Sequence, residues 1–415
     1  MTSIVDNVLQ EPDFTDPAVY VPGVPHEALD AIRDREHLVW QPTSHGTFNG
    51  GLWLVTRYRD VMDIESRPAD FSSVPGAFYP LGNLDGDSPM QKHILFMDPP
   101  EHSRLRRMAS RSFGPRIVKR FDGWVREVTE EALDDAFARK KFDFVDDVAK
   151  LIPCRVMSAI MGVPNEMREQ IVQWSLDVFA AQATAENDGG AAFASVFADI
   201  GQYMSTLGKE KLRNPQDDLL SVVAASLDNG EIDEFEYQMY ATGILVAGTE
   251  TTQTLMAQSI RLMVENEDTR ATFEKAFTTG QYLKVVEECL RYVTPAYNVA
   301  RTATRDLDFN GQQIRSGDTM QLILAAANRD PDIFTDPHRF DPFRDPKPLA
   351  AEGVAFGSGP HRCVGSMLAK LELKILFEEI HRRGARLDLN GQPERGWSAL
   401  VNQLNTLPLK IATPD

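Results

Sequence analysis

The sequence has few cysteines and no long apolar run. Only Cys154, Cys289 and Cys363 occur among 415 residues, and they are odd in number and widely spaced. This usage argues against a disulfide framework and indicates a reducing compartment. No stretch of about 18 uncharged apolar residues is present, so we expect no membrane-spanning helix. Residues 1–14 lack a basic segment followed by an apolar one, and we therefore expect no signal peptide and a cytoplasmic protein.

Positive charge is also scarce. The 43 Lys and Arg residues face 61 Asp and Glu residues, which gives a formal net charge of −18. Such a surface repels the phosphates of nucleic acids and of anionic lipids, which argues against both as partners. A binding site for an acidic partner would have to be a local basic patch.

The pattern of the chain predicts one mainly α-helical domain over residues 1–415 with small β-sheets, an α+β arrangement, because no repeat or flexible linker divides it. We expect the helical part around 101–293 and 365–384, with a long buried helix over 235–264 and another over 283–292. We expect the β-rich part around 38–60, 296–325 and 396–412. Residues 71–98 are rich in Gly, Pro, Ser and Asp and predict a long loop.

The segment Phe356-Gly-Ser-Gly-Pro-His-Arg-Cys-Val-Gly365 precedes an amphipathic helix. Gly357 and Gly359 permit a tight turn and a close approach of the backbone to a flat ligand. Cys363 lies at the start of the helix, where the dipole and free N–H groups favour a thiolate. An anionic sulfur suits the iron of a haem, and His361 could donate to a haem carboxylate.

Three simpler readings compete for this segment. A lone cysteine at a helix start is usually structural, and a glycine-rich turn before a helix can bind phosphate. The G-x-G spacing followed by Arg362 does not complete the dinucleotide fingerprint. A zinc site would need two more ligands beside His361 and Cys363, and none is near in the sequence.

The long apolar helix carries Ala247-Gly-Thr-Glu-Thr-Thr252 at its middle. Ala247 and Gly248 leave space beside the helix, and Gly248 permits a local kink. Glu250 can relay protons from water, and Thr251 can donate a hydrogen bond. A kink with a solvated glutamate is the simpler reading, but burying a charge in so apolar a helix is costly.

Two further pairs lie at helical spacing. Glu288 and Arg291 share a helix face at i and i+3, and by itself such a pair is usually a surface salt bridge. His102 and Arg106 share a face at i and i+4 in the segment that begins Asp98-Pro-Pro. Arginine is suited to carboxylates, so this second pair could hold an anionic group.

Together these segments resemble the cytochrome P450 family, whose signatures read F-x-x-G-x-H-x-C-x-G, A-G-x-[D/E]-T-T, E-x-x-R and D-P-P-x-H-x-x-x-R. They follow in the family's order and span about residues 98–370. The resemblance implies a single triangular helix-rich fold. It also implies haem b (heme, iron protoporphyrin IX) with a thiolate ligand from Cys363, and O2 as co-substrate.

The resemblance also implies a role for each matching residue. Glu250 and Thr251 would deliver protons during oxygen activation. The haem carboxylates would be held by His102, Arg106, Arg301 and His361. A buried structural clamp would join Glu288, Arg291 and Arg339, with Cys289 as a small core residue between the first two. The substrate pocket would be lined by Gly243, Val246, Ala247, Tyr297, Leu400 and the loop bearing Phe78 and Tyr79.

The implied activity is hydroxylation of a small, mostly apolar substrate such as a terpenoid, an aromatic or a hydrocarbon-like molecule. No flavin, nicotinamide or ferredoxin motif is present, so the resemblance implies electrons from a ferredoxin, of the [2Fe-2S] type, and its reductase. Arg104, Arg107 and Arg111 form a basic stripe that is either a solvated helix face or a docking site for that carrier. We expect a monomer.

Three alternatives remain open at this point. A peroxygenase would use peroxide instead of O2, but such members typically lack the acid–alcohol pair seen at Glu250 and Thr251. A haem-binding sensor would be expected to carry an attached signalling or DNA-binding module. An all-helical interaction protein would be colourless when purified.

Overall fold

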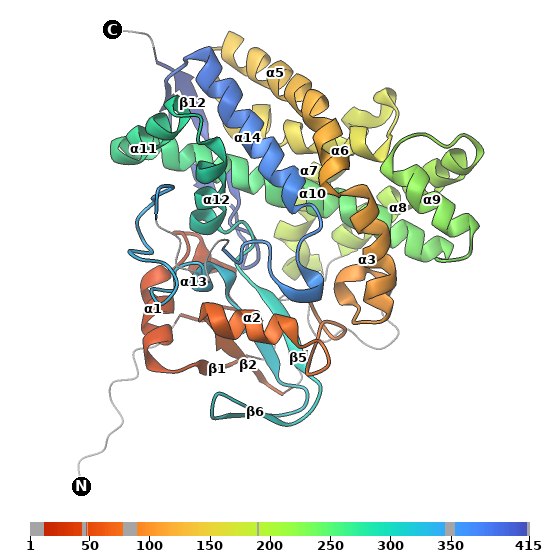
Figure 1. Cartoon of the computed structure of the whole chain (residues 1–415), viewed down its shortest axis with the longest axis vertical. Coiled ribbons are helices and arrows are strands. Elements are labelled where there is room, and N and C mark those ends of the chain that lie inside the picture. The colour runs from red at the N-terminus through yellow and green to blue at the C-terminus, as the bar shows by residue number, and fades with distance from the viewer. Residues whose placement is uncertain are drawn as a thin grey trace.

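The computed structural model describes residues 12–43, 47, 49–77, 89–188, 191–344 and 353–412. Helices fill one side of the molecule and the largest sheet lies at the other (Figure 1). The helices are α1 (His26–Arg35), α2 (Tyr58–Ser66), α3 (Glu101–Ser112), α4 (Pro115–Val118), α5 (Asp122–Ala138), α6 (Leu151–Met161), α7 (Arg168–Asp188), α8 (Ala191–Arg213), α9 (Leu219–Asp228), α10 (Glu234–Glu265), α11 (Glu267–Thr278), α12 (Tyr282–Val293), α13 (Leu324–Ala327) and α14 (Ser366–Arg383).

Short helical turns and strands connect these helices. The turns are η1 (Pro17–Tyr20), η2 (Pro89–Lys92), η3 (Ile94–Phe96), η4 (Lys119–Phe121), η5 (Val145–Ala149), η6 (Asn165–Met167) and η7 (Gly359–His361). The strands are β1 (Leu38–Pro42), β2 (Gly51–Val55), β3 (Phe71–Ser72), β4 (Lys141–Asp143), β5 (Val299–Ala303), β6 (Leu307–Phe309), β7 (Gln312–Ile314), β8 (Thr319–Leu322), β9 (Leu387–Leu389), β10 (Glu394–Arg395), β11 (Leu404–Thr406) and β12 (Pro408–Ile411).

The largest sheet has the strand order β1-β2-β8-β5-β3. Strands β2 and β8 are parallel, whereas the other neighbouring pairs in this sheet are antiparallel. Smaller sheets pair β4-β12-β9, β10-β11 and β6-β7. Because β8 lies between β2 and β5, the chain around residues 38–55 is tied to the chain around 299–322, as expected for one β-rich part drawn from distant segments.

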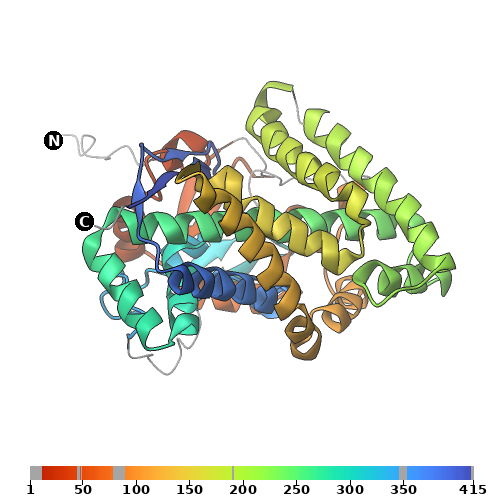
Figure 2. The same cartoon turned by 90° about the horizontal axis from the view of Figure 1, so that it is seen from above.

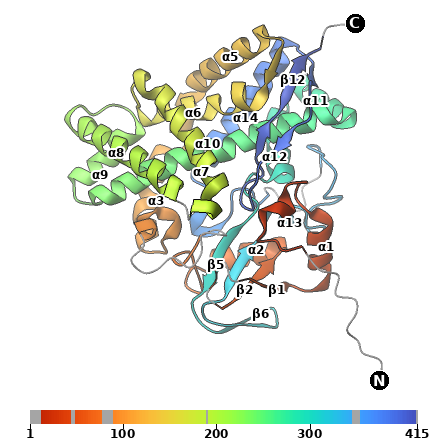
Figure 3. The same cartoon turned by 180° about the vertical axis from the view of Figure 1, so that it is seen from behind.

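Helix α10 passes through the middle of the helical part in both the front and rear views (Figures 1 and 3). It contacts α6, α8, α12 and α14 among others, so most of its faces are buried. Asp233 caps its start, because its side chain accepts from the N–H of Glu236 while Glu236 reaches back to the N–H of Asp233. Seen from above, α7 and α8 lie side by side over one end of α10 (Figure 2).

The structure corrects several expected boundaries. In the β-rich part expected around 38–60, strand β2 ends at Val55, because Tyr58 already begins α2 and donates its N–H to Asp330. The expected β pattern around 296–325 is interrupted by α13. The expected loop over 71–98 contains β3, η2 and η3, and its residues 78–88 lie outside the described part of the chain. No helix in the described part is long and apolar enough to cross a membrane.

Candidate functional site

The cysteine loop connects the irregular segment after α13 to the start of α14. Gly357 and Gly359 adopt φ angles of +63° and +60°, a left-handed conformation that favours glycine, which explains their place in the loop. The N–H of Cys363 donates to the carbonyl of Phe356 at 2.9 Å, and this closes the loop. Turn η7 lies between them and contacts α2.

Cys363 lies deep among protein atoms, yet its side chain faces open space and is solvent-accessible. Burial raises the pKa of its thiol, and the opposing effects are hydrogen bonds from the N–H groups of Gly365 and Ser366 and the charges of Arg106 and Arg362. The N–H groups at the helix start thus favour the thiolate, as the sequence predicts, while burial acts against it. A bound metal ion deprotonates a coordinating thiol outright, so a metal bound to Cys363 would make its side chain a thiolate.

Four nitrogen-bearing side chains gather beside this loop. The rings of His102 and His361 lie 4.0 Å apart between centroids. Burial, followed by the charge of Arg106, lowers the pKa of His102 to about 4. Burial, followed by the charge of Arg301, lowers the pKa of His361 to about 2, so both rings are neutral at pH 7. The structure thus brings together all four side chains that the sequence assigned to haem carboxylates.

This group fits an anionic ligand. The Nδ1 atom of His102 is buried and has no hydrogen-bond partner among the described residues. Burial also lowers the pKa of Arg106 and Arg301, which indicates that both guanidinium groups lack full compensation by nearby carboxylates. Carboxylates of a haem would supply the missing charge and acceptors, so the donor set fits that cofactor.

The middle of α10 carries the acid–alcohol pair, Glu250 and Thr251. Ala247 is exposed although its helix is central, whereas Glu250 is buried. The hydroxyl of Thr251 donates to the carbonyl of Ala247 at 2.9 Å, so Thr251 turns toward the exposed residue one turn earlier. Gly248 has a different use from the expected one, because a Cβ there would lie 2.8 Å from the sulfur of Met157. Its missing side chain makes room for α6.

The expected pocket residues divide into two groups. Val246, Ala247 and Leu400 are at least partly accessible, as pocket lining requires. Gly243 is buried against the ring of His93, and Tyr297 is buried in a separate core. Neither residue is accessible in the way that the expected lining requires. Phe78 and Tyr79 lie outside the described residues.

Tyr297 is held in its core by specific contacts. Its ring stacks on Tyr20 with centroids 4.5 Å apart, and its hydroxyl donates to Asn402 at 3.3 Å. The pocket role of Tyr297 was implied by the family resemblance. Its stacking partner Tyr20 comes from η1, 277 positions earlier, and no local sequence pattern predicts this contact.

The expected clamp is partly confirmed. Arg291 and Glu288 form a buried pair, with Nη2 and Oε1 2.7 Å apart and side chains 3% and 7% exposed. Arg339 contributes only its carbonyl oxygen to Arg291, and its own side chain is 68% exposed. The second guanidinium at Glu288 comes from Arg344, at 3.3 Å. Arg344 therefore takes the side-chain place that we expected for Arg339.

The basic stripe on α3 is also smaller than expected. Arg104 pairs with the buried carboxylate of Glu236 and donates to the carbonyl of Glu231, so it ties α3 to the start of α10. Arg107 is exposed. The side chain of Arg111 lies outside what the structure describes.

Glu65 is a residue of this site that sequence reasoning missed. It lies at the end of α2, is buried, and accepts hydrogen bonds from the N–H and the hydroxyl of Ser358, both at 2.8 Å. Its other oxygen lies 3.5 Å from Arg301. Because α2 and the cysteine loop are 293 residues apart, no spacing in the sequence could link them.

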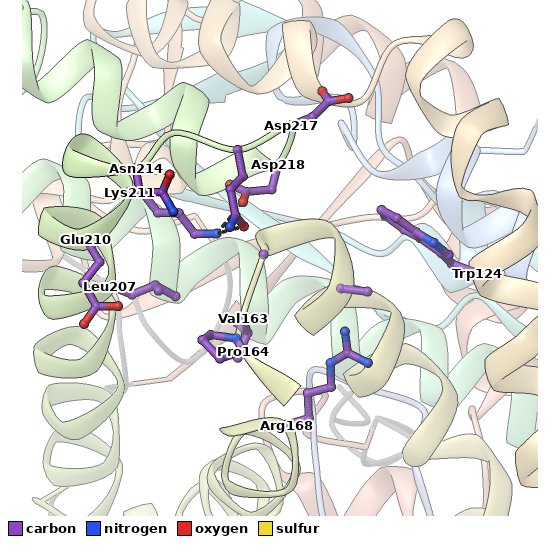
Figure 4. Close-up of a pocket in the computed structure, with 13 residues that line it drawn as sticks. Trp124, Val163, Pro164, Arg168, Leu207, Glu210, Lys211, Asn214, Asp217 and Asp218 are labelled. Carbon is purple, nitrogen blue, oxygen red and sulfur yellow. Dashed lines mark hydrogen bonds and ion pairs between the residues drawn. The ribbon is translucent and has the colours of Figure 1, made fainter. Parts of the chain in front are cut away.

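A surface cleft of about 490 Å³ lies elsewhere, between α5, α6, α7 and α8 (Figure 4). Its two most buried charges, Lys211 and Asp218, pair with each other, and Lys211 also donates to Gln216. None of its lining residues belongs to the cysteine loop or α14. The cleft is therefore separate from the site around Cys363.

Comparison with known proteins extends these findings. The sequence model of the cytochrome P450 family matches residues 281–383. Erythromycin C-12 hydroxylase of Saccharopolyspora erythraea is 33% identical over 384 residues, which cover 90% of this chain and 92% of that protein. Steroid C26-monooxygenase of Mycobacterium tuberculosis is 30% identical over 399 residues, covering 93% and 90%. The crystal structure of cytochrome P450-153 from Novosphingobium aromaticivorans is 27% identical, covers 96% and 99%, and superposes with a TM-score of 0.84.

The helix-rich fold and the relatives named above place the chain in a class of oxygen-activating enzymes. The chain belongs to the cytochrome P450 family, and its enzymatic class is that of a cytochrome P450 monooxygenase. The family's fold is the one observed, mainly helical with small sheets. The family implies a haem-thiolate centre.

Proposed function

We propose that this chain hydroxylates a small, mostly apolar molecule at a haem b centre ligated by Cys363. The observation that carries the proposal is the position of Cys363, whose side chain is solvent-accessible while main-chain N–H groups of Gly365 and Ser366 hydrogen-bond its sulfur. These hydrogen bonds stabilise a negative sulfur, as a thiolate ligand needs. His102, Arg106, Arg301 and His361 would hold the haem carboxylates. When bound, the thiolate-ligated haem supplies the capacity to cleave O2.

The chain's own residues on α10 would serve proton delivery. The hydroxyl of Thr251 donates its proton to the carbonyl of Ala247, whose side chain is exposed. Glu250 is the adjacent residue and is buried. Its carboxyl would therefore pass a proton to a nearby group such as the Thr251 hydroxyl. Because both groups lie on one turn of a rigid central helix, their positions relative to the open space are fixed. A peroxide-driven reaction would not need this pair.

The ligand assignment is tested by Cys363→Ala. We expect the variant to lose the red-shifted Soret band of the reduced CO complex, because that band reports thiolate ligation of a haem. Cys289→Ala is the matched control, since Cys289 is fully buried in the core and should leave the band in place. Retention of the band in Cys363→Ala would refute the assignment.

The substrate proposal rests on the apolar character of Val246, Ala247 and Leu400, the accessible members of the expected lining. The names of two relatives refer to a steroid and to erythromycin, so similar degrees of identity accompany different substrates. A screen by haem spin-state shift should therefore include steroids, terpenoids, aromatics and alkanes. We expect at least one apolar class to shift the spin state, and a response confined to highly charged ligands would contradict the proposal.

We also propose that a [2Fe-2S] ferredoxin and its reductase supply the electrons, with Arg107 in the docking surface. Arg107 is an exposed positive charge on a chain with a net charge of −18, so an acidic carrier would be attracted to it locally. Arg107→Gln should raise the apparent KM for the carrier and flatten its dependence on salt. Arg139→Gln, which removes an exposed arginine at the end of α5, is the control for net charge. Equal effects of the two variants would contradict docking at Arg107.

A further inference from the structure

Glu65 joins three parts of the site that come from distant segments. Its Oε2 atom accepts from both the N–H and the hydroxyl of Ser358 in the cysteine loop, and its Oε1 atom lies 3.5 Å from Nη2 of Arg301 on β5. The side chains of Glu65 and Arg301 are 2% and 5% exposed. Burial raises the pKa of the Glu65 carboxyl, while the charge of Arg301 and the two hydrogen bonds from Ser358 act in the opposite direction and favour its ionised form.

The cysteine loop is shaped around this residue. A Cβ on Gly357 would lie 3.0 Å from Oε1 of Glu65, and a Cβ on Gly359 would collide with the carbonyl oxygen of Glu65. Both glycines also adopt left-handed φ angles. The loop that carries Cys363 is thus pressed against the last turn of α2, and the side chain of Glu65 holds it there through Ser358.

A neutral residue would be enough to hold the loop. An amide oxygen in place of the carboxylate could accept from Ser358, and burying a charge costs free energy that an amide avoids. The charge finds its compensation in Arg301, whose Nη1 donates to the carbonyl of Ala300 and thus leaves Nη2 on the side of Glu65. The negative charge at this position therefore acts on Arg301 and on its surroundings.

We propose that Glu65 is a positioning residue of the haem site, which fixes the cysteine loop through Ser358 and places a buried negative charge beside Arg301. This inference rests on the proposed haem function. A fixed negative charge disfavours the gain of an electron nearby and reduces the positive charge that Arg301 offers to a haem carboxylate. Glu65 thereby lowers the reduction potential of the centre.

The test compares reduction potentials of wild-type holoenzyme and Glu65→Gln by spectroelectrochemistry. The variant keeps an oxygen acceptor for Ser358 and removes the charge. We expect it to retain the red-shifted Soret band of the reduced CO complex. We expect its equilibrium constant for one-electron reduction to rise roughly three- to tenfold, which is a positive shift of at most about 59 mV.

Two further variants separate charge from structure. Asp60→Asn removes another buried carboxylate of the same helix, one that bonds His37 and Asn310 away from the cysteine loop, and it should leave the potential unchanged. Glu65→Asp keeps the charge on a shorter side chain, and its potential should lie closer to wild type than that of Glu65→Gln. Equal shifts in the Asp and Gln variants would show that the placement of the side chain, and not its charge, sets the potential, and would overturn the electrostatic role.

The outcomes also distinguish this inference from the proposed function. A wild-type protein that gives no red-shifted band would overturn the haem assignment and, with it, any role of Glu65 at a haem. A normal band in wild type, with equal potentials in wild type and Glu65→Gln, would overturn the role of Glu65 alone.

Discussion

At the scale of single residues, the most informative side chain on the central helix is Thr251. Its neighbour Thr249 also donates its hydroxyl to carbonyls one turn earlier, those of Leu245 and Val246, but Thr249 is buried. Thr251 differs because it is half-buried and its hydroxyl bonds the carbonyl of Ala247, a residue that is exposed. The two threonines therefore offer a matched comparison of the same hydroxyl in two environments.

Replacing Thr251 by alanine should leave substrate binding nearly intact and divert electrons to peroxide. The proton path would lose its hydroxyl, and positioned proton transfer contributes large rate factors, so product formed per NADH should fall by roughly tenfold or more. Product, peroxide and NADH would be measured together, with substrate binding followed by spin state. Thr249→Ala should keep the coupling of wild type. Unchanged coupling in Thr251→Ala would count against a role in proton delivery.

Residue types with a local signature could be assigned from the sequence, and residues defined by distant contacts could not. The Glu288–Arg291 pair is fixed by helical spacing and is found as expected. Arg339 was misassigned because the spacing places its backbone, and not its guanidinium, at the clamp. Tyr297 was misassigned because its stacking partner Tyr20 is remote in the sequence. The described site thus departs from expectation at residues whose position is set by contacts between distant parts of the chain.

At the scale of elements, long helices could be predicted closely and short strands could not. The helix expected over 235–264 is α10, Glu234–Glu265, and the one over 283–292 is α12, Tyr282–Val293. Strands β4 and β9 were missed, because three residues cannot show a periodicity. They exist only because β12 pairs with both of them.

The clamp joins α12 to the segment that follows α13. Arg291 bonds Glu288 and also donates to the carbonyls of Asn328 and Pro337. Arg291→Gln should therefore lower the free energy of unfolding by about 3–5 kcal/mol, because it leaves a buried carboxylate and several carbonyls without a partner.

Urea unfolding would measure this loss. Arg305→Gln is the control, because Arg305 pairs with Asp70 at 2.9 Å while its side chain is 62% exposed. An exposed pair of this kind should cost under about 1 kcal/mol. Similar losses for the two variants would show that the clamp is no more important than a surface pair.

At the scale of the whole molecule, the architecture follows from the order of the family's signatures more than from any one pattern. The net charge, the apolar fraction and the helical periodicity are consistent with many folds. The strand order β1-β2-β8-β5-β3 could not be derived from spacing, because backbone hydrogen bonds pair β2 with β8, which are more than 240 residues apart in the sequence. The family resemblance predicted the overall architecture, which the periodicity of the sequence could not predict.

Acid sensitivity is a property of the whole fold, since buried histidines are distributed across it. Burial lowers the pKa of His93 to about 4 and that of His26 to about 2. For His26, the nearby charges of Arg329, His338 and Arg33 add to the effect of burial. A histidine with a lowered pKa binds fewer protons in the folded than in the unfolded chain. Its contribution is therefore fully present above the unfolded pKa of 6.5 and is lost as pH falls toward the folded pKa.

For His26 the window runs from pH 6.5 down to about 2, with a slope of about 1.4 kcal/mol per pH unit. Between pH 6.5 and pH 5 this single group should remove about 2 kcal/mol of unfolding free energy. Urea unfolding of wild type and His26→Gln at both pH values would isolate its share. We expect the loss between the two pH values to be smaller in the variant by about that amount. His381→Gln serves as the exposed-histidine control, and equal pH dependence in wild type and His26→Gln would contradict the lowered pKa of His26.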